Sequence, residues 1–204
     1  MKSTRSGFKS LVELVVTVAV AVGVALLIQA LIVKPYRIPS PSMVPTLDVG
    51  QRVLVNRLDT SPGLGDVVVF HPPSGSNPAD ALCAAASQGS GHPQACDRPT
   101  KGQAGSTFIK RLVGLPGDRI QIIDGHVIRN GKPEHDPYIV QCRSQDPVPC
   151  NFRQSITIPP AHYFMMGDNR GFSDDSRLWG PVPQQWIIGV AFFTYWPLRR
   201  VGTL

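Results

Sequence analysis

The sequence predicts a mainly β protein that one N-terminal transmembrane helix anchors to a membrane. Three observations support this prediction. Proline contributes 20 and glycine 19 of the 204 residues, nearly a fifth of the chain, which favours short strands and many turns. Short runs rich in β-branched residues recur between residues 52 and 196. A single long apolar stretch lies close to the N-terminus.

The apolar stretch is predicted to be an uncleaved membrane anchor. It runs from Leu14 to Val33, is interrupted only by Thr17, Gly23 and Gln29, and would span roughly 30 Å as a helix. A cleavable signal peptide is the alternative, but its apolar region usually covers about 7–15 residues and ends at small residues. Here the apolar run continues directly into a lysine and a proline. We therefore expect an anchor.

Charges on either side of the anchor predict its orientation. Lys2, Arg5 and Lys9 precede the apolar stretch, whereas only Lys34 and Arg37 follow it closely. Because positive residues are enriched on the cytoplasmic side, the N-terminus is expected in the cytoplasm. Residues 1–34 would then form a cytoplasmic stub and the anchor, and residues 35–204 one extracytoplasmic domain with a single core of ordinary size.

The chain is basic, with a formal net charge of +6 and a pI of about 9.4. Such a charge suits either nucleic acid or the anionic headgroups of a lipid bilayer. The sequence has no dense run of lysine and arginine with interleaved aromatic residues. We therefore expect a bilayer, and no nucleic acid, as partner.

The four cysteines predict two local disulfides. Cys83 and Cys96 lie 13 residues apart, and Cys142 and Cys150 lie 8 apart, in stretches rich in turn-forming residues. Disulfides require an oxidising compartment, which agrees with an exported domain. Four free thiols are one alternative. A zinc site with His92 is another, but the spacing lacks a second half-site, so neither metal nor cofactor is expected.

Strands are predicted, in chain order, at 52–55, 66–70, 108–113, 119–123, 155–158, 163–166 and 187–196. Asp124-Gly125 predicts a tight hairpin turn, and Asn130-Gly131 a second one, because a type I′ turn needs positive φ at both central residues. Residues 72–106 carry almost no apolar periodicity and are expected to form a surface excursion.

A proline-rich segment carries two candidate serines just after the anchor. Ser40 and Ser42 lie among prolines that prevent any helix from continuing. A flexible linker is the alternative. However, the segment passes at once into Met43 to Leu47 and a strand, an apolar pattern that fits a core. The serines are therefore expected on a rigid corner.

A serine nucleophile needs a base, and Lys110 is the strongest candidate. The five histidines, at positions 71, 92, 126, 135 and 162, all have the surroundings of surface residues. Lys110 instead interrupts an apolar strand on the same face as Phe108 and Leu112, while Arg111 lies on the other face. Burial would lower the lysine pKa by as much as about 3–5 units and leave a neutral amine. A solvated lysine on an edge strand is the alternative.

A polar block at 166–177 follows a predicted strand and combines acidic, basic and hydroxyl groups. It could be an ordinary surface loop. It could also supply a hydroxyl that orients an amine, together with ion pairs that keep the loop rigid.

Three blocks in this order, at 39–47, 108–118 and 166–180, together resemble bacterial signal peptidase I, the leader peptidase family. The resemblance implies a serine endopeptidase that cuts signal peptides from secretory preproteins after small residues. It implies Ser42 as nucleophile, Lys110 as general base and Ser40 in the oxyanion hole. Ser173 would orient the lysine amine, with support from Asp175 and Arg177. Asp168, Asn169 and Arg170 match the third block and are given structural roles only.

The resemblance also implies a fold of antiparallel sheets with a smaller β subdomain inserted at about residues 120–160. Two positions depart from the family pattern. Pro41 stands where glycine is frequent, and Gly171-Phe172 replaces a more polar pair before Ser173. Two other functions stay open, a self-cleaving serine/lysine protease and a catalytically idle membrane-anchored binding domain. The anchor and paired cysteines speak against the first, and Lys110 within an apolar strand against the second.

Overall fold

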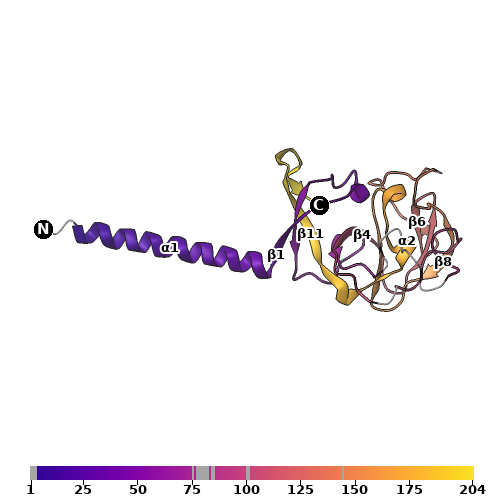
Figure 1. Cartoon of the computed structure of the whole chain (residues 1–204), viewed down its shortest axis with the longest axis horizontal. Coiled ribbons are helices and arrows are strands. Elements are labelled where there is room, and N and C mark those ends of the chain that lie inside the picture. Colours follow the sequence, from indigo (N-terminus) through magenta and orange to yellow (C-terminus); the bar gives the residue numbers. More distant parts are fainter. Residues whose placement is uncertain (1–3, 75, 77–82, 84–85, 100–101, 144) are drawn as a thin grey trace. The chain divides into compact units, whose positions relative to one another are not determined.

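The computed structural model describes residues 4–74, 76, 83, 86–99, 102–143 and 145–204. The chain divides into two compact units, one ending at Lys34 and the other running from Pro35 to Leu204. The first contains α1 (Thr4–Leu31), a continuous helix of 28 residues (Figure 1). Within it, Ser10–Gln29 is the one span of the described residues that is long and apolar enough to cross a membrane.

The helix ends two residues before the predicted anchor does. Ile32 forms a turn, and Val33 already belongs to strand β1 (Val33–Arg37). The physical reason is Pro35, because a proline disfavours helical backbone in the residue before it and cannot itself donate an i to i−4 hydrogen bond.

The larger sheet of the second unit has the order β1-β2-β11-β3-β4-β9-β10, with β12 paired to β11. Its other strands are β2 (Arg52–Asn56), β3 (Val67–Phe70), β4 (Phe108–Gly114), β9 (His162–Met166), β10 (Val182–Pro183), β11 (Ile187–Trp196) and β12 (Gly202–Thr203). From β2 to β10 each pair is antiparallel. The mainly β prediction is confirmed. Strand β4, which carries Lys110, is an interior strand between β3 and β9, not an edge strand.

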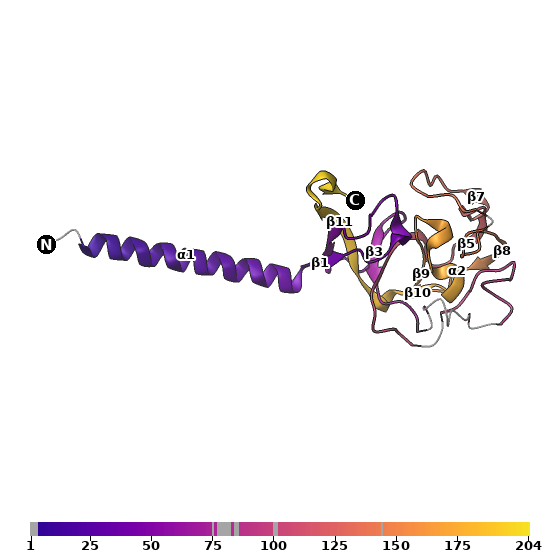
Figure 2. The same cartoon turned by 45° about the horizontal axis from the view of Figure 1, so that its top comes forward.

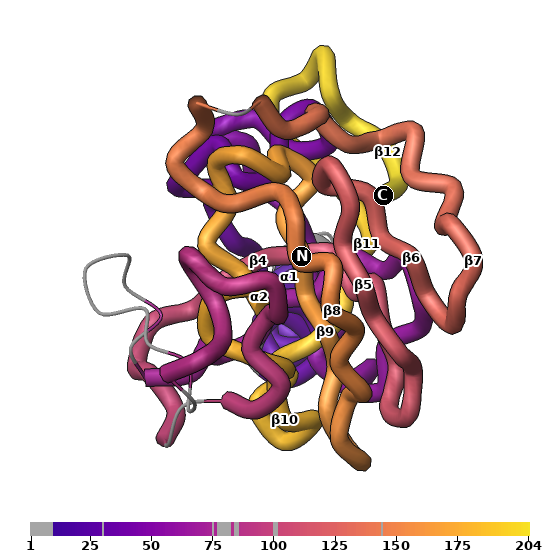
Figure 3. Tube along the Cα trace, turned by 90° about the vertical axis from the view of Figure 1, so that its right-hand side faces the viewer, coloured from indigo at the N-terminus to yellow at the C-terminus, as the bar shows by residue number. Residues whose placement is uncertain are grey.

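A smaller sheet contains β5 (Arg119–Ile123), β6 (His126–Arg129), β7 (Lys132–Pro133) and β8 (Phe152–Thr157). Its order is β7-β6-β5-β8, as Figure 3 shows, and its strands fall in the stretch predicted as an insertion. Both predicted turns occur, since φ is positive at 124 and 125 and again at 130 and 131. In Figure 2, β5, β7 and β8 lie at one end of the domain and β11 at the other.

Short helices occupy the loops between the strands. They are the 3-10 turns η1 (Pro41–Met43), η2 (Arg170–Phe172), η3 (Gln184–Trp186) and η4 (Leu198–Arg200), and the α-helical turn α2 (Ser176–Trp179). The sequence did not predict α2. The carboxylate of Asp175 caps it by accepting from the backbone N–H of Arg177, which explains why one helical turn is stable there.

Two apolar clusters form the core. The larger cluster joins the two sheets and includes Leu112, Ile120, Phe152, Phe164 and Trp179. The smaller contains Ile38, Met43, Leu47, Val53, Val55, Val67, Val69 and Ala191. Strand β4 contributes Leu112 to the larger cluster, and Ile109 of the same strand packs against the smaller cluster. Lys110, which lies between these two residues along the strand, is therefore placed between two packed regions.

Both predicted disulfides are present, with Cα atoms 5.3 Å apart for Cys83–Cys96 and 5.8 Å apart for Cys142–Cys150. The first belongs to the stretch predicted as a surface excursion, and that prediction is only partly right. Ala95 and Cys96 are buried, and the Cys96 N–H donates to the carbonyl of Arg177 at 3.2 Å. The apolar pattern of the sequence could not predict this contact, because a backbone N–H in a short irregular segment makes it.

Candidate active site

Ser42 lies on the 3-10 turn η1. The extended residue Ser40 precedes this turn, and the apolar residue Met43 ends it. Met43 and Leu47 are fully buried in the smaller apolar cluster, so the turn is packed in place as the sequence predicts. Only 6% of Ser42 is exposed. Its hydroxyl oxygen lies 3.2 Å from that of Ser40, close enough for a hydrogen bond in either direction.

Asn169 fastens this turn to the polar block at 166–177. Its backbone N–H donates to the carbonyl of Ser42 at 3.1 Å, and its side-chain amide donates to the carbonyl of Pro41 at 3.2 Å. The two bonds together fix the position and tilt of the η1 turn.

Lys110 is the buried amine that the sequence predicts. It lies opposite Val68 in the sheet, is 4% exposed, and its Nζ stands 5.7 Å from the centre of the Phe108 ring. Burial lowers the pKa of Lys110 from 10.5 to about 8, because desolvation outweighs the nearby carboxylates of Asp175 and Asp174, which act in the opposite direction. Lys110 is therefore partly neutral near pH 8.

The neighbouring cation, Arg111, is also largely buried, at 11% side-chain exposure, but it is fully paired. Its guanidinium donates to both oxygens of Asp168, at 2.8 and 2.7 Å, and to the carbonyl of Gly65 at 2.6 Å. It also stacks 4.0 Å from the centre of the Tyr138 ring. Thr46, four residues after the serine, donates to the same Asp168 carboxylate at 2.6 Å. The Arg111–Asp168 ion pair, which also binds Thr46, thus joins the segment that carries Ser42 to strand β4.

Ser40, Ser42 and Lys110 line one pocket of about 300 Å³. The remaining lining residues are Tyr36, Arg37, Ile38, Pro39, Val69, Thr107, Phe108, Ile109, Phe172 and Asp174. None of the five histidines, all of which the structure describes, lines it. His126 does pair with a carboxylate, Asp136, at 2.8 Å, but it belongs to the smaller sheet. Of the lysine and the five histidines considered as bases, all of them in the described part of the chain, Lys110 is the one that lines the pocket of Ser40 and Ser42.

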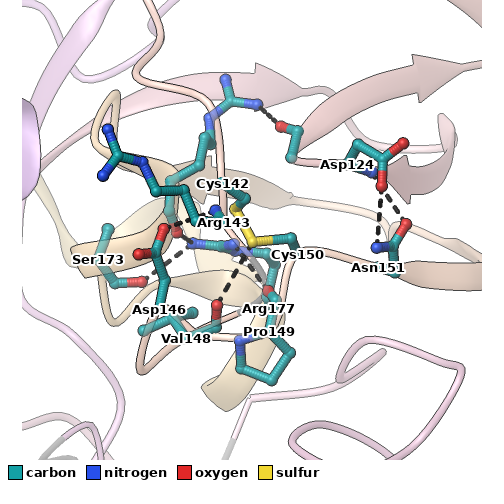
Figure 4. Close-up of a disulfide and its surroundings, with 12 residues drawn as sticks. Asp124, Cys142, Arg143, Asp146, Val148, Pro149, Cys150, Asn151, Ser173 and Arg177 are labelled. Atoms are coloured by element: carbon teal, nitrogen blue, oxygen red, sulfur yellow. Dashed lines mark hydrogen bonds between the residues drawn. A yellow bond between two sulfur atoms is a disulfide. The ribbon is translucent and has the colours of Figure 1, made fainter.

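The loop from Ser173 to Arg177 is held by a buried ion pair. Arg177 donates to Asp175 from Nε at 2.7 Å and from Nη2 at 2.8 Å, and neither side chain is exposed. Arg177 also donates to the carbonyls of Ser173 and Pro149, as Figure 4 shows beside the Cys142–Cys150 disulfide. Burial alone would raise the pKa of Asp175, but Arg177, Lys110 and the Gly167 N–H lower it below its ordinary value.

Ser173 itself is fully buried, and its hydroxyl has no hydrogen-bond partner among the residues that the structure describes. Gly167 lies against it. A Cβ atom at Gly167 would overlap both the Ser173 hydroxyl and the carbonyl oxygen of Ser42. The absence of a side chain at 167 therefore allows the third block to pack directly on the serine turn.

The structure thus brings Ser40, Ser42 and Lys110 to one pocket and packs the Ser173–Arg177 loop beside it. The sequence predicts no specific contact for Asn169 and no role for Gly167 or Asp174, and it indicates Phe172 only as part of a departure from the family pattern. The apolar pattern of the sequence does not indicate these residues, because they either contact backbone atoms or line the pocket. Within the described ranges, no three His, Cys, Asp or Glu side chains are grouped to hold a metal ion, and both sulfurs of the zinc alternative are in a disulfide.

Comparison with known proteins identifies the family. The family profile described as "Signal peptidase, peptidase S26" matches residues 11–196. A probable signal peptidase I-1 of Synechocystis is 37% identical over 91% of this chain and 82% of its own length. A signal peptidase I of Leptolyngbya laminosa is 35% identical over 95% of this chain and 84% of its own length.

A solved signal peptidase I from Enterococcus faecalis V583 is 25% identical and covers 64% of this chain and 96% of that one, with a TM-score of 0.40. At that score the family assignment rests on the sequence comparisons. The family profile spans nearly the whole chain, from within the apolar helix to the end of β11, and two relatives match at more than 30% identity over most of their length. The chain is therefore a membrane-anchored member of the signal peptidase family, peptidase S26.

Proposed function

We propose that this protein is a serine endopeptidase that removes N-terminal signal peptides from exported preproteins. One observation carries the proposal: a nearly buried serine and a buried lysine of lowered pKa line the same pocket. A binding domain gains nothing from an amine that is buried at a cost and forms no ion pair within the described part of the chain. The names of its relatives, signal peptidase I, support the same substrate class.

In the proposed reaction, the Ser42 hydroxyl oxygen attacks the carbonyl carbon of the peptide bond, and Lys110 accepts the hydroxyl proton. The resulting oxyanion is stabilised by the backbone N–H of Ser42 and by the Ser40 hydroxyl, which already lies 3.2 Å from the nucleophile. The carbon–nitrogen bond then breaks, and the Lys110 ammonium gives its proton to the leaving amine.

Water completes the cycle in the same way. Lys110 takes a proton from water, the hydroxide attacks the acyl carbon, and Ser42 leaves with its proton restored. No metal or organic cofactor is needed for these steps. The residue before the cut is expected to be small, because the pocket measures about 300 Å³ and large side chains such as Tyr36, Phe108 and Ile109 line it.

The other residues of the third block would position this pair. Ser173 is proposed to orient the Lys110 amine, since its buried hydroxyl has no other partner in the described residues. Asp175 and Arg177 hold the Ser173 carbonyl and the loop around it. Their charges act on Lys110 in opposite directions, and Asp175 raises the pKa of Lys110 more than Arg177 lowers it.

We further propose that the catalytic domain lies outside the cytoplasm, at the cell membrane. Two disulfides require an oxidising compartment, and the excess of lysine and arginine before α1 favours a cytoplasmic N-terminus. The partners would be secretory preproteins and the lipid bilayer.

The proposal is tested by incubating the purified full chain, in detergent micelles, with a preprotein and mapping the product by mass spectrometry. A single cut after a small residue, lost in Lys110→Ala, supports it. Cleavage only within the chain itself would indicate the self-cleaving alternative, and binding without any cleavage would indicate the idle domain.

A further inference from the structure

Arg200 holds the backbone of the serine segment, residues 41–48, just after Ser42. Its guanidinium donates from Nη2 to the carbonyl oxygen of Pro45 at 2.7 Å and to that of Thr46 at 2.9 Å. The Thr46 hydroxyl donates at 2.6 Å to Asp168, which belongs to the third block. Thr46 is therefore fixed through its side chain by the third block and through its carbonyl by Arg200.

Arg200 reaches the serine segment from a well-supported turn of the larger sheet. It is the last residue of η4, and its backbone N–H donates to the carbonyl of Pro197 at 2.8 Å. Strand β12, which follows this turn, pairs with β11, which precedes it. The buried side chain of Gln51, close after the serine segment, donates to the hydroxyl of Thr194 on β11 at 2.9 Å. The end of β11 and the turn after it thus support the serine segment from its backbone side.

A shift of the two carbonyls that Arg200 holds would move Ser42. Two overlapping turns, 41–44 and 43–47, connect these carbonyls to the nucleophile, and a backbone hydrogen bond closes each of them, at 3.1 and 2.8 Å. Arg200 does not line the pocket, and it is not among the charges that act on Lys110. Any effect of Arg200 on the reaction must therefore pass through the backbone of the serine segment.

We propose that Arg200 is a positioning residue for Ser42, which it holds within reach of Lys110 through the carbonyls of Pro45 and Thr46. The inference rests on the proposed peptidase function and adds a residue outside the pocket and outside the three sequence blocks. The ion pair between Arg200 and Asp48, at 3.1 Å, is partly exposed and is not expected to carry the effect.

The test compares Arg200→Met with the wild type, both as full chains in non-ionic detergent, on a signal-peptide substrate. The variant keeps the apolar stem of the side chain and removes both bonds to the carbonyls. We expect kcat to fall about tenfold at nearly unchanged KM, because bonds that position a nucleophile act in the transition state. The midpoint of the pH profile should stay at about 8, because Arg200 does not act on Lys110.

Two control variants separate the carbonyl bonds from charge. Arg199 is exposed on the same turn and forms no hydrogen bond or ion pair within the described part of the chain, so Arg199→Met should keep the wild-type kcat. Asp48→Asn removes the ion pair and leaves both carbonyl bonds of Arg200, so its kcat should stay within about twofold of the wild type.

Rescue separates positioning from a purely structural role. Arg200→Lys keeps a charged donor and should recover part of the kcat that Arg200→Met loses. Ethylguanidinium, at concentrations that leave the wild-type rate unchanged, should raise the kcat of Arg200→Ala, because a free guanidinium can donate to the same two carbonyls.

A kcat for Arg200→Met within about twofold of the wild type would overturn the inference. So would a loss of the folded state in this variant, or a loss of kcat that neither lysine nor ethylguanidinium restores, because the residue would then act on folding alone. Each of these results leaves the peptidase function intact, provided that the wild type cuts the substrate and Ser42→Ala does not. If the wild type cuts neither this substrate nor a preprotein, the proposed function and the inference both fail.

Discussion

The backbone N–H of Asn169 donates to the carbonyl oxygen of Ser42 at 3.1 Å, across 127 positions of the sequence. Through this bond the turn that carries the proposed nucleophile is fixed to the loop that carries Asp175 and Arg177. The side-chain bond from Asn169 to the Pro41 carbonyl adds a second point of attachment. The geometry of the pocket therefore depends on residues that do not line it.

Replacing Asn169 by alanine removes the side-chain bond and keeps the backbone bond. Loss of one hydrogen bond of about 1 kcal/mol should lower kcat about fivefold, with KM nearly unchanged, because the turn is less well positioned in the transition state. Steady-state kinetics with a signal-peptide substrate measures both constants. Asn151→Ala, which removes a bond to Asp124 on the smaller sheet, is the control and should leave both constants near their wild-type values.

The lowered pKa of Lys110 sets the pH dependence of cleavage. The general base must be neutral, so the rate should rise as the pH passes through about 8 and level off above it. A profile of kcat/KM from pH 6 to pH 10 measures this. A rate that instead rose with a midpoint near 6.5 would indicate a histidine base.

The lowered pKa of Lys110 also predicts that burial of this lysine reduces the free energy of unfolding. A pKa lowered from 10.5 to about 8 corresponds to roughly 3 kcal/mol. Below pH 8 the folded chain carries the full penalty of a buried ammonium. Between pH 8 and 10.5 only the unfolded chain binds this proton, so stability should rise with pH.

Lys110→Met, which keeps the length and removes the charge, should be inactive yet more stable than the wild type at pH 7, by about 2–3 kcal/mol. Denaturant unfolding of the full chain in detergent measures the difference. An inactive Lys110→Met variant that is also less stable would show that the ammonium is well compensated in the folded state.

The buried pair of Asp175 and Arg177 should be costly to break from either side. Arg177→Met leaves a buried carboxylate, and Asp175→Asn leaves a buried guanidinium, so each should reduce the free energy of unfolding by about 3–5 kcal/mol. Because the two side chains act together, the double variant should lose less than the sum of the single losses. Additive losses would mean that the two groups contribute independently.

The Cys142–Cys150 disulfide should support the same loop. It closes the segment whose Pro149 carbonyl accepts from Arg177, and Val148 donates to the Gly171 carbonyl. Replacing both cysteines by serine should destabilise the domain by about 2–3 kcal/mol. Unfolding measured with and without reductant checks this, because the variant should no longer respond to reduction of that bond.

The sequence predicted the strands because their apolar patterns are regular, and both hairpin turns because Asp-Gly and Asn-Gly tolerate positive φ. The sequence predicted a buried amine at Lys110 because a charged lysine in the middle of an apolar strand is unfavourable. Strand β4 is an interior strand and Lys110 is buried, which excludes the alternative of a solvated lysine on an edge strand.

The sequence could not predict the contacts that assemble the pocket. Asn169 and Gly167 act on the backbone of the serine turn, and backbone contacts leave no periodic signal. The helical turn α2 was missed because it is only four residues long and owes its stability to the Asp175 cap and to burial. The roles of Ser40, Ser42, Lys110, Ser173 and the ion pair stay predictions.

The most direct test of the serine/lysine mechanism is cleavage of a preprotein by the purified full chain and a set of single variants. Ser42→Ala, Lys110→Ala and Lys110→Arg should each cut at less than about a thousandth of the wild-type rate while remaining folded, since arginine cannot act as a base. Alanine variants of the five histidines should retain most of the activity. Near-normal turnover by Lys110→Ala, together with loss of activity in any histidine variant, would contradict the account.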